Sequence, residues 1–394
     1  METDHSKHVV TKIFNQSFLE IFLINFLVMI TFYSLTVAIG PYAVDALGLS
    51  QAVGGLLVGI TVIGSLFARL SSGILMEKLN TKQILFVGAG ILLISLISYP
   101  LITSLSLLVI MRFVQGIAIG LIGTITNTAI VLVVPPDRKS EGISYFSLST
   151  IIATAFGPFL ALILIDSIGF KNLFFLEIIL GILVLAAIFM VHESAVDLPN
   201  KGKHQKISIH SFVEPKVLPI ALVMLIAAIS YSAIQSDLSF FMKSEHMAKY
   251  SSIFFVIYAV SILASRPFTG VLADKKNENY VAYPSFILLI LGFVALSQVN
   301  GVFLFIVSAI LIGVGFGNLQ STIQSTIAKM VPIDRLGVST STYFILFDLA
   351  FGIGPVILGI IAPIIGFKAL FELMIFVVAV SLVLYYFVHG KKIQ

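Results

Sequence analysis

Long apolar segments recur along this sequence and leave few folds open to it. Residues 21–44 read IFLINFLVMITFYSLTVAIGPYAV, and residues 172–191 read NLFFLEIILGILVLAAIFMV. Each segment reaches the ~20 apolar residues that a helix needs to cross the hydrocarbon core of a bilayer. Apolar residues make up 58% of the chain and charged residues 11%, against about 25% charged residues in soluble proteins. The sequence therefore predicts an all-α integral membrane protein.

Twelve segments of this kind are predicted to be transmembrane helices. The first follows a polar stretch that has no small-residue cleavage site, so we expect a retained span there rather than a removed signal peptide. With an error of several residues at each boundary, the spans cover roughly 18–42, 52–76, 83–103, 106–134, 142–166, 172–192, 217–240, 250–273, 281–299, 302–330, 338–362 and 369–389.

The distribution of lysine and arginine between the loops predicts the orientation of the spans. Sixteen of these residues fall on one side, and only Lys171, Lys243, Lys249 and Lys368 fall on the other. Positively charged loops stay in the cytoplasm, so we expect a protein of the cell (plasma) membrane with both termini cytoplasmic. The net charge of +4 reflects this asymmetry and indicates no nucleic-acid partner.

The chain also repeats itself at half its length. Residues 68–78 read ARLSSGILMEK, and SRPFTGVLADK begins 197 positions later, at residue 265 of a chain of 394. The same offset brings together Gly116 with Gly313, Gly120 with Gly317, Pro135 with Pro332, Gly157-Pro158 with Gly354-Pro355, and the run 169–171 with 366–368. Parallel repeats of this kind are a recurrent transporter design. We therefore expect two six-helix halves, residues 1–191 and 217–394, joined by a polar cytoplasmic linker, residues 192–216.

Motifs in both halves resemble those of the major facilitator superfamily (MFS). Residues 73–82, GILMEKLNTK, are similar to the family pattern G-x-L-A-D-R-x-G-R-R, with Glu and Lys in place of the first Asp-Arg pair. The counterpart at 270–275, GVLADK, keeps the Asp, and residues 112–116, RFVQG, match the pattern R-x-x-Q-G. The resemblance covers nearly the whole chain and implies the MFS fold, in which twelve helices form two pseudo-symmetric halves.

A further motif is similar to one found in the twelve-span drug:proton antiporters of that family. Gly157-Pro158 lies where those antiporters carry a glycine-rich Gly-Pro motif, although Ser144 and Ala153 replace two of its glycines. The resemblance implies proton-coupled export. Glycine and proline also suit a hinge or a close helix contact, so Gly157, Pro158, Gly354 and Pro355 are the expected hinge, with simple helix kinks as the alternative.

Charge and glycine at the cytoplasmic ends of the second and eighth spans are predicted to form a gate. Arg69 and Glu77 lie eight residues apart, about two turns along one helix face, and Arg266 and Asp274 repeat the spacing. Partly solvated ion pairs between the halves, worth ~0–1 kcal/mol each, are weak enough to break in every cycle. The alternative is positive-inside topology with glycines that serve tight turns. The gate residues are Arg69, Gly73, Glu77, Lys78, Arg266, Gly270 and Asp274.

Asp348 is the acidic residue placed deepest in a predicted span. The surrounding sequence, STYFILFDLAFGIGP, contains no basic residue. A charge at that depth costs ~2.5–3.5 kcal/mol on insertion scales, so we expect it to face the bundle interior or water. Loading a proton from one side and releasing it to the other would couple transport to the proton gradient. Two alternatives stay open, a packing role beside Gly352 and Gly354 and direct contact with a cationic substrate.

Arg112 is expected to be the only other strongly buried charge well inside a span. A buried guanidinium stays protonated and needs a carboxylate or several carbonyl partners. The sequence offers Asp45 and Asp348 as partners and does not choose between them. The matching arginine of the resembling antiporters is assigned to proton transfer, so the resemblance implies that role for Arg112; the alternative is a structural ion pair.

The substrate is expected to bind near the midplane between the halves. Each polar or aromatic candidate for this cavity is more often an interhelical hydrogen-bonding group than a ligand contact. The candidates are Asn25, Tyr33, Gln115, Asn127, Tyr231, Gln235, Asp237, Asn318 and Gln324.

Other chemistry is missing from the sequence. No phosphate-binding loop with Lys and Ser/Thr is present, no histidine spacing suggests a metal site, and cysteine is absent. We therefore expect no enzymatic activity, metal or cofactor beyond the proton gradient, and a monomer. The predicted function is proton-coupled antiport that exports a small organic compound, such as a drug-like amphiphile or a secreted metallophore. The alternatives are a proton symporter that imports a sugar or organic acid, and a non-transporting receptor or lipid scramblase.

Overall fold

The computed structural model describes residues 12–102, 104–135, 139–191, 213–332 and 335–392. Throughout these ranges the regular structure is helical, and no strand occurs. The long helices are α1 (Gln16–Pro41), α2 (Gln51–Lys78), α3 (Thr81–Ser98), α4 (Leu105–Val133), α5 (Lys139–Ile168), α6 (Phe170–Met190), α8 (Leu218–Ser244), α9 (Ser251–Lys275), α10 (Asn279–Ser297), α11 (Val302–Lys329), α12 (Leu336–Ile365) and α13 (Phe367–Val388). Short helical turns are η1 (Tyr42–Ala46), η2 (Tyr99–Leu101), η5 (Ala248–Tyr250) and η7 (Gly390–Lys392).

Twelve of the described helices are long and apolar enough to cross a membrane, which confirms the predicted number of spans. The ends of several are set by local hydrogen bonds. For example, the Asn80 side chain accepts from the Gln83 backbone N–H while the Gln83 side chain accepts from the Asn80 N–H. This reciprocal cap satisfies donors that the first turn of a helix leaves free, and α3 therefore begins at Thr81.

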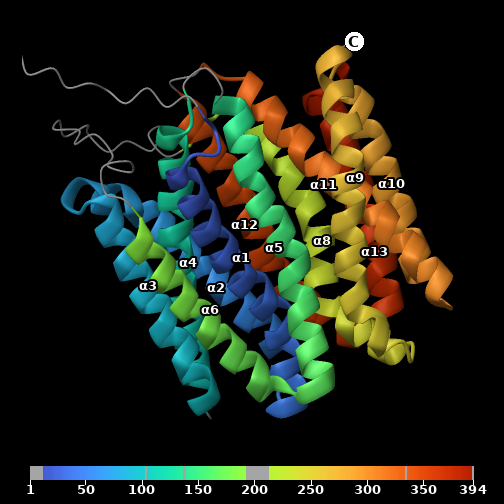
Figure 1. The fold of residues 1–394 in the computed structure, drawn as a ribbon. Helices are drawn as coiled ribbons and strands as arrows, with labels where there is room; N and C mark the ends of the chain where they lie inside the picture. The colour runs from blue at the N-terminus through green and yellow to red at the C-terminus, as the bar shows by residue number, and fades with distance from the viewer. Residues whose placement is uncertain (1–11, 103, 136–138, 192–212, 333–334, 393–394) are drawn as a thin grey trace, which may run out of the picture.

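The helices form two groups, each with its own apolar core. One core lies within the blue-to-green helices α1–α6, and the other is formed mainly by the yellow-to-red helices α8–α13, with Val37, Val62 and Leu162 of the first group added (Figure 1). α6 ends at Met190 and α8 begins at Leu218, and most of the expected linker between them lies outside the described residues. We call the end of the bundle where α1 begins and α13 ends the terminal end, drawn at the top of Figure 1. The opposite end, with η1 and η5, is the distal end.

Close helix contacts repeat between the two groups with the offset found in the sequence. A Cβ on Gly116 of α4 would collide with the backbone of Thr61 on α2, and a Cβ on Gly313 of α11 would collide with Tyr258 on α9. Thr61 and Tyr258 are themselves 197 positions apart, as Gly116 and Gly313 are. The repeated glycines therefore serve the same close approach in each half, which is direct evidence for the pseudo-symmetry predicted from the sequence.

Among the described residues, the most extensive contacts between the two groups are those of α2 with α12, α5 with α9, and α1 with α8. Toward the distal end, the backbones of α2 and α12 approach each other very closely. Gly55 faces the Pro355 carbonyl, and Gly59 faces the Gly352 carbonyl, each so closely that a Cβ would not fit. These contacts bring backbone against backbone across the boundary between the halves, as small residues do in membrane interiors.

Candidate functional site

A cavity lies between the two halves near the middle of the bundle. Its walls come from α1, α5, α8, α9, α11 and α12. Two of the residues expected to line a substrate cavity, Tyr33 and Tyr231, do so, together with Thr150, Thr154 and Gln320. The cavity is thus built from residues of both halves.

Aromatic rings form one wall of this cavity. The Tyr231 ring stacks on Phe316 with centroids 4.4 Å apart and on Tyr258 with centroids 4.9 Å apart. The buried Tyr231 hydroxyl interacts with Tyr258 and Gln235 without completing a hydrogen bond of normal geometry. The stack presents flat apolar surface with polar groups at its edge, which suits a planar ligand.

Arg266 is the charged residue that lines the cavity. The sequence predicted that Arg266 lies in the cytoplasmic gate with Asp274. The structure does not describe the side chain of Asp274. The Arg266 Nε atom is buried and has no hydrogen-bond partner among the described residues, and no ion pair to it forms there. Its guanidinium interacts electrostatically with Tyr258 in the cavity wall. Among the described residues, the cavity lining therefore holds one positive charge that no carboxylate pairs with.

Arg69 and Asp348 form an ion pair between the halves. Arg69 Nη2 of α2 lies 2.9 Å from Asp348 Oδ2 of α12, and the two side chains are 22% and 20% exposed. Tyr33, in the cavity wall, interacts electrostatically with both residues. The sequence analysis placed Arg69 in the gate and left the partner of Asp348 open. The structure brings them together on the terminal side of the cavity.

Arg112 has neither of the partners that the sequence offered for it. Its Nε donates to the Leu57 carbonyl at 2.9 Å and its Nη1 donates to Gln115 Oε1 at 2.6 Å. The Tyr99 hydroxyl donates to the same Gln115 oxygen at 2.5 Å. Asp45 and Asp348 are paired elsewhere, because α4 faces α2 and α3 within its own half.

The expectation that Arg112 and Asp348 are the only strongly buried charges inside the spans is wrong. Glu177 of α6 is completely buried, and its Oε1 accepts a hydrogen bond from the Ser34 hydroxyl of α1. Glu177 interacts electrostatically with Arg112 without forming an ion pair. Glu177 lies several residues inside an apolar segment, so the depth argument used for Asp348 was sufficient to find it.

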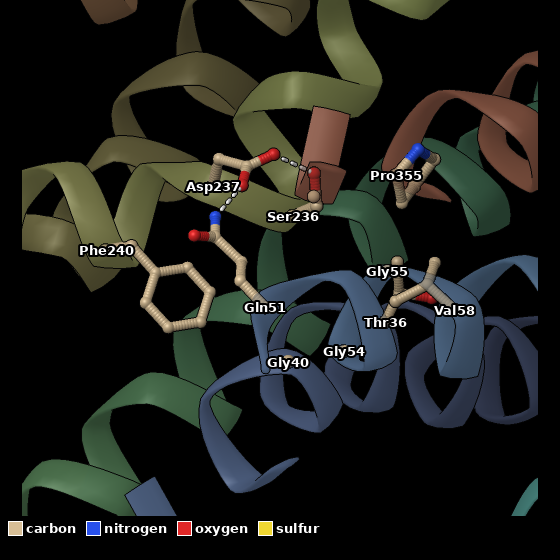
Figure 2. A pocket seen from close by; sticks show the side chains of 11 residues that line it. Thr36, Gly40, Gln51, Gly54, Gly55, Val58, Ser236, Asp237, Phe240 and Pro355 are labelled. Atoms are coloured by element: carbon tan, nitrogen blue, oxygen red, sulfur yellow. Dashed lines mark hydrogen bonds between the residues drawn. The ribbon is translucent and has the colours of Figure 1, made fainter. Parts of the chain in front are cut away.

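A second, smaller cavity lies between the halves toward the distal end (Figure 2). There the Gln51 side chain of α2 points to Asp237 of α8 and donates to its Oδ1 at 2.6 Å, while Ser236 donates to Oδ2 (Figure 2). Nearer the distal surface, Lys243 Nζ lies 2.9 Å from Asp45 Oδ1. Asp237 and Asp45 thus connect the halves at the distal end, rather than lining the central cavity or contacting Arg112.

The remaining cavity candidates lie outside the central cavity. Asn25 donates to Ser149 and Thr150 of α5, and Asn318 donates to Ser265 of α9, so both connect helices of one half. Asn127 is exposed and donates to the Gly123 carbonyl of its own helix. Gln235, Gln115 and Gln324 are also absent from the cavity lining.

The structure describes the expected hinge residues but only some of the expected gate residues. The side chains of Glu77, Lys78 and Asp274, together with Gly73 and Gly270, lie outside the described set, at the terminal ends of α2 and α9. Gly157 packs against Ile30 and Ser34 of α1, and Gly354 packs against Ser232 of α8. Pro158 and Pro355 lie inside α5 and α12, and Pro355 also meets Gly55 of the other half.

Within the described residues, no group of three or more His, Cys, Asp or Glu side chains is arranged to hold a metal ion.

Comparison with known proteins identifies relatives of the whole chain. The family model described as Major Facilitator Superfamily matches residues 21–355 and 285–393. The chain is 22% identical over 336 residues to the staphylopine export protein of Staphylococcus aureus, covering 82% of this chain and 83% of that one. It is 29% identical over 170 residues to the purine ribonucleoside efflux pump NepI of Escherichia coli, covering 42% of this chain and 41% of the pump.

Solved structures show the same arrangement of helices. A POT family transporter in complex with a thioalcohol-conjugated peptide is similar with a TM-score of 0.78, at 14% identity and with 96% of each chain covered. An inward-facing bacterial homolog of the human lysosomal transporter Spinster gives a TM-score of 0.74, at 15% identity, covering 94% of this chain and 96% of the homolog. At these identities the likeness concerns the fold.

Proposed function

The chain belongs to the Major Facilitator Superfamily, and from that premise we propose that it exports a small organic compound from the cell in exchange for protons. In this proposal the protein works as a monomer in the plasma membrane, and the terminal end faces the cytoplasm. The central cavity is the substrate site, and the two halves rock about it so that it opens to one side at a time. The proton gradient drives the cycle, without a further cofactor.

The observation that carries this proposal is the ion pair between Arg69 and Asp348. It joins α2 of one half to α12 of the other beside the cavity. Protonation of Asp348 would remove the negative charge and with it most of the attraction to Arg69. Because a pair of this kind must break in each cycle, a partly solvated position is favourable. A proton taken up from outside thus releases the terminal side, and the proton leaves to the cytoplasm.

Contacts at the distal end would have to break in the other half of the cycle. Gln51 bonds to Asp237 and Lys243 pairs with Asp45 between the halves. These are one neutral–charged hydrogen bond and one exposed ion pair, both of modest strength in water. Their opening lets the substrate leave to the outside. In this scheme the distal contacts close the outer side of the cavity. The cytoplasmic gate expected from the sequence would close the opposite side.

Export is favoured over import by the relatives, two of which are named for export or efflux. A second candidate, uptake of an organic acid together with a proton, is supported by the unpaired Arg266 in the cavity wall. Both functions use the same residues. They differ in the sign of proton movement when substrate is added.

Everted membrane vesicles with a respiration-generated pH gradient and a fluorescent pH probe test the proposal. We would add aromatic carboxylates, nucleosides, cationic amphiphiles and metallophores to vesicles with the wild type, Asp348→Asn, or the exposed control Asp166→Asn. A substrate should dissipate the gradient in the wild type and the control but not in Asp348→Asn. Equal dissipation in Asp348→Asn would exclude Asp348 as the coupling site, and proton movement of the opposite sign would identify a symporter.

A further inference from the structure

The central cavity has an unbalanced charge. Arg266 lines it without a hydrogen-bond or ion-pair partner for its guanidinium among the described residues, and no acidic residue belongs to the lining. The nearby carboxylate, Asp348, is already paired with Arg69. The cavity therefore carries a net positive charge while that ion pair is intact. The half-buried guanidinium of Arg266 cannot lose its proton, so a ligand that supplies an anion gains most from this site.

The walls around Arg266 restrict the shape of the ligand. Tyr258 stacks on Tyr231, which stacks in turn on Phe316, at interplanar angles of 21° and 16°. Tyr258 also interacts electrostatically with Arg266, so the charge lies beside the aromatic stack. A planar ring placed against such a stack makes offset or edge contacts. Its anionic substituent would then meet the guanidinium, which binds carboxylates in a bidentate manner.

From these two features we infer that the cavity selects an aromatic carboxylate. This inference rests on the proposed transport function and names its substrate class. A cationic substrate is disfavoured, because the carboxylate that would attract it is occupied by Arg69 and the remaining charge repels it. A neutral aromatic compound gains the stacking but not the charge-assisted hydrogen bonds, which are roughly twice as strong as neutral ones.

Equilibrium binding to the purified protein tests the inference without any gradient, so its failure is distinct from a failure of the transport proposal. The probes are 2-naphthoate, 2-naphthamide and 2-naphthamidine, which share one ring system and differ in charge. The chain contains no tryptophan, so naphthalene fluorescence is read with little protein background. We expect 2-naphthoate to bind about tenfold more tightly than the amide, in line with a charge-assisted contact, and the amidine to bind least.

Variants of α9 then assign the charge preference. Arg266→Gln should lower the affinity for 2-naphthoate to that for 2-naphthamide, whereas Arg266→Lys should keep part of the preference. Lys276→Gln removes a positive charge from an exposed position at the end of the same helix and should leave all three affinities unchanged.

Three results would overturn the inference. They are binding of the amidine at least as tight as that of the naphthoate, absence of saturable naphthoate binding, and a charge preference that survives Arg266→Gln. If Arg266→Gln does not fold, as judged by circular dichroism and gel filtration, the ligand series on the wild type and Arg266→Lys still decides the question.

Discussion

Most of the charged residues described inside this bundle are held by a neighbour on another helix or on their own, and Arg266 is the exception. Arg69 has Asp348, Arg112 has Gln115 and the Leu57 carbonyl, and Glu177 has the Ser34 hydroxyl. In an apolar medium an unpaired charge is expensive. These contacts therefore let the residues stay charged or strongly polar at membrane depth, where they are able to serve transport.

Removing one partner of the Arg69–Asp348 pair leaves the other without its counter-charge. We expect Asp348→Asn and Arg69→Gln each to lower the free energy of unfolding by ~1–3 kcal/mol, and the double variant to lose less than the sum of the two, because neighbouring charges couple by ~0.5–3 kcal/mol. Thermal unfolding in detergent measures all four proteins. Strictly additive losses would contradict a direct interaction. The double variant should remain inactive in the vesicle assay even where its stability recovers.

Glu177 offers a second residue-scale prediction. Glu177→Ala removes the acceptor of the Ser34 hydroxyl and a carboxyl group that interacts electrostatically with Arg112, which should cost ~1–3 kcal/mol of stability. Glu177→Gln keeps an oxygen that accepts from Ser34 and should cost less. Glu245→Ala, at an exposed position, is the control. Thermal unfolding that ranks Glu177→Ala with the control would show that this buried contact contributes nothing.

Sequence reasoning located several of these residues but not their pairings. The depth of Asp348 and the motif positions of Arg69 and Arg112 were readable from the sequence. Their partners depend on how α2 and α12 are rotated about their axes, and a sequence pattern does not fix that rotation across the two halves. Glu177 lies in no recognised motif, and only its depth in an apolar segment indicates it.

At the scale of helices, small residues set the distance between the halves. Gly55 leaves no room for a Cβ against the Pro355 backbone, whereas Gly90 has nothing within 4 Å of the position of an added Cβ. Gly55→Ala should therefore destabilise the protein by ~1–3 kcal/mol through overpacking. Gly90→Ala, also inside a helix, should be neutral or stabilising by up to ~1 kcal/mol. Thermal unfolding compares the two, and equal effects would argue against a close contact of α2 with α12.

A charged hydrogen bond connects the segment before α8 to the start of α12. Arg335 donates to Glu214 Oε2 at 2.8 Å, and this hydrogen bond holds the pKa of Glu214 below its ordinary value of 4.5. The stabilisation is thus present above pH 4.5 and is lost as the pH falls through the lowered pKa. Glu214→Gln should lower the unfolding temperature at about pH 7. The difference from the wild type should shrink toward about pH 3, and a constant difference would contradict this account.

Helices were the most predictable elements of the chain. Apolar length gave the number of spans, and the 197-residue offset indicated the repeat that recurs in the contacts of Gly116 and Gly313. The helix ends were less predictable. α1, for instance, continues through a π-helical turn to Ala46, beyond the expected end at residue 42, because backbone hydrogen bonding and not hydrophobicity decides where a helix stops.

As a whole, the molecule consists of two packed halves joined by contacts of modest strength. Such contacts are broken and remade at low cost, whereas each half keeps its own apolar core. Movement is therefore expected between the halves and not within them. The cavity lies at that boundary, with the Arg69–Asp348 pair beside it.

The most direct test of proton control through Asp348 is a distance measured between the halves as a function of pH. The chain has no cysteine, so spin labels at Leu132→Cys and Met330→Cys, exposed positions at the terminal ends of α4 and α11, report the opening of that end by double electron–electron resonance. The account predicts a longer distance on acidification from about pH 8 to about pH 5, and a long distance at every pH in Asp348→Asn. A distance that does not respond to pH, or an unchanged response in Asp348→Asn, would contradict it.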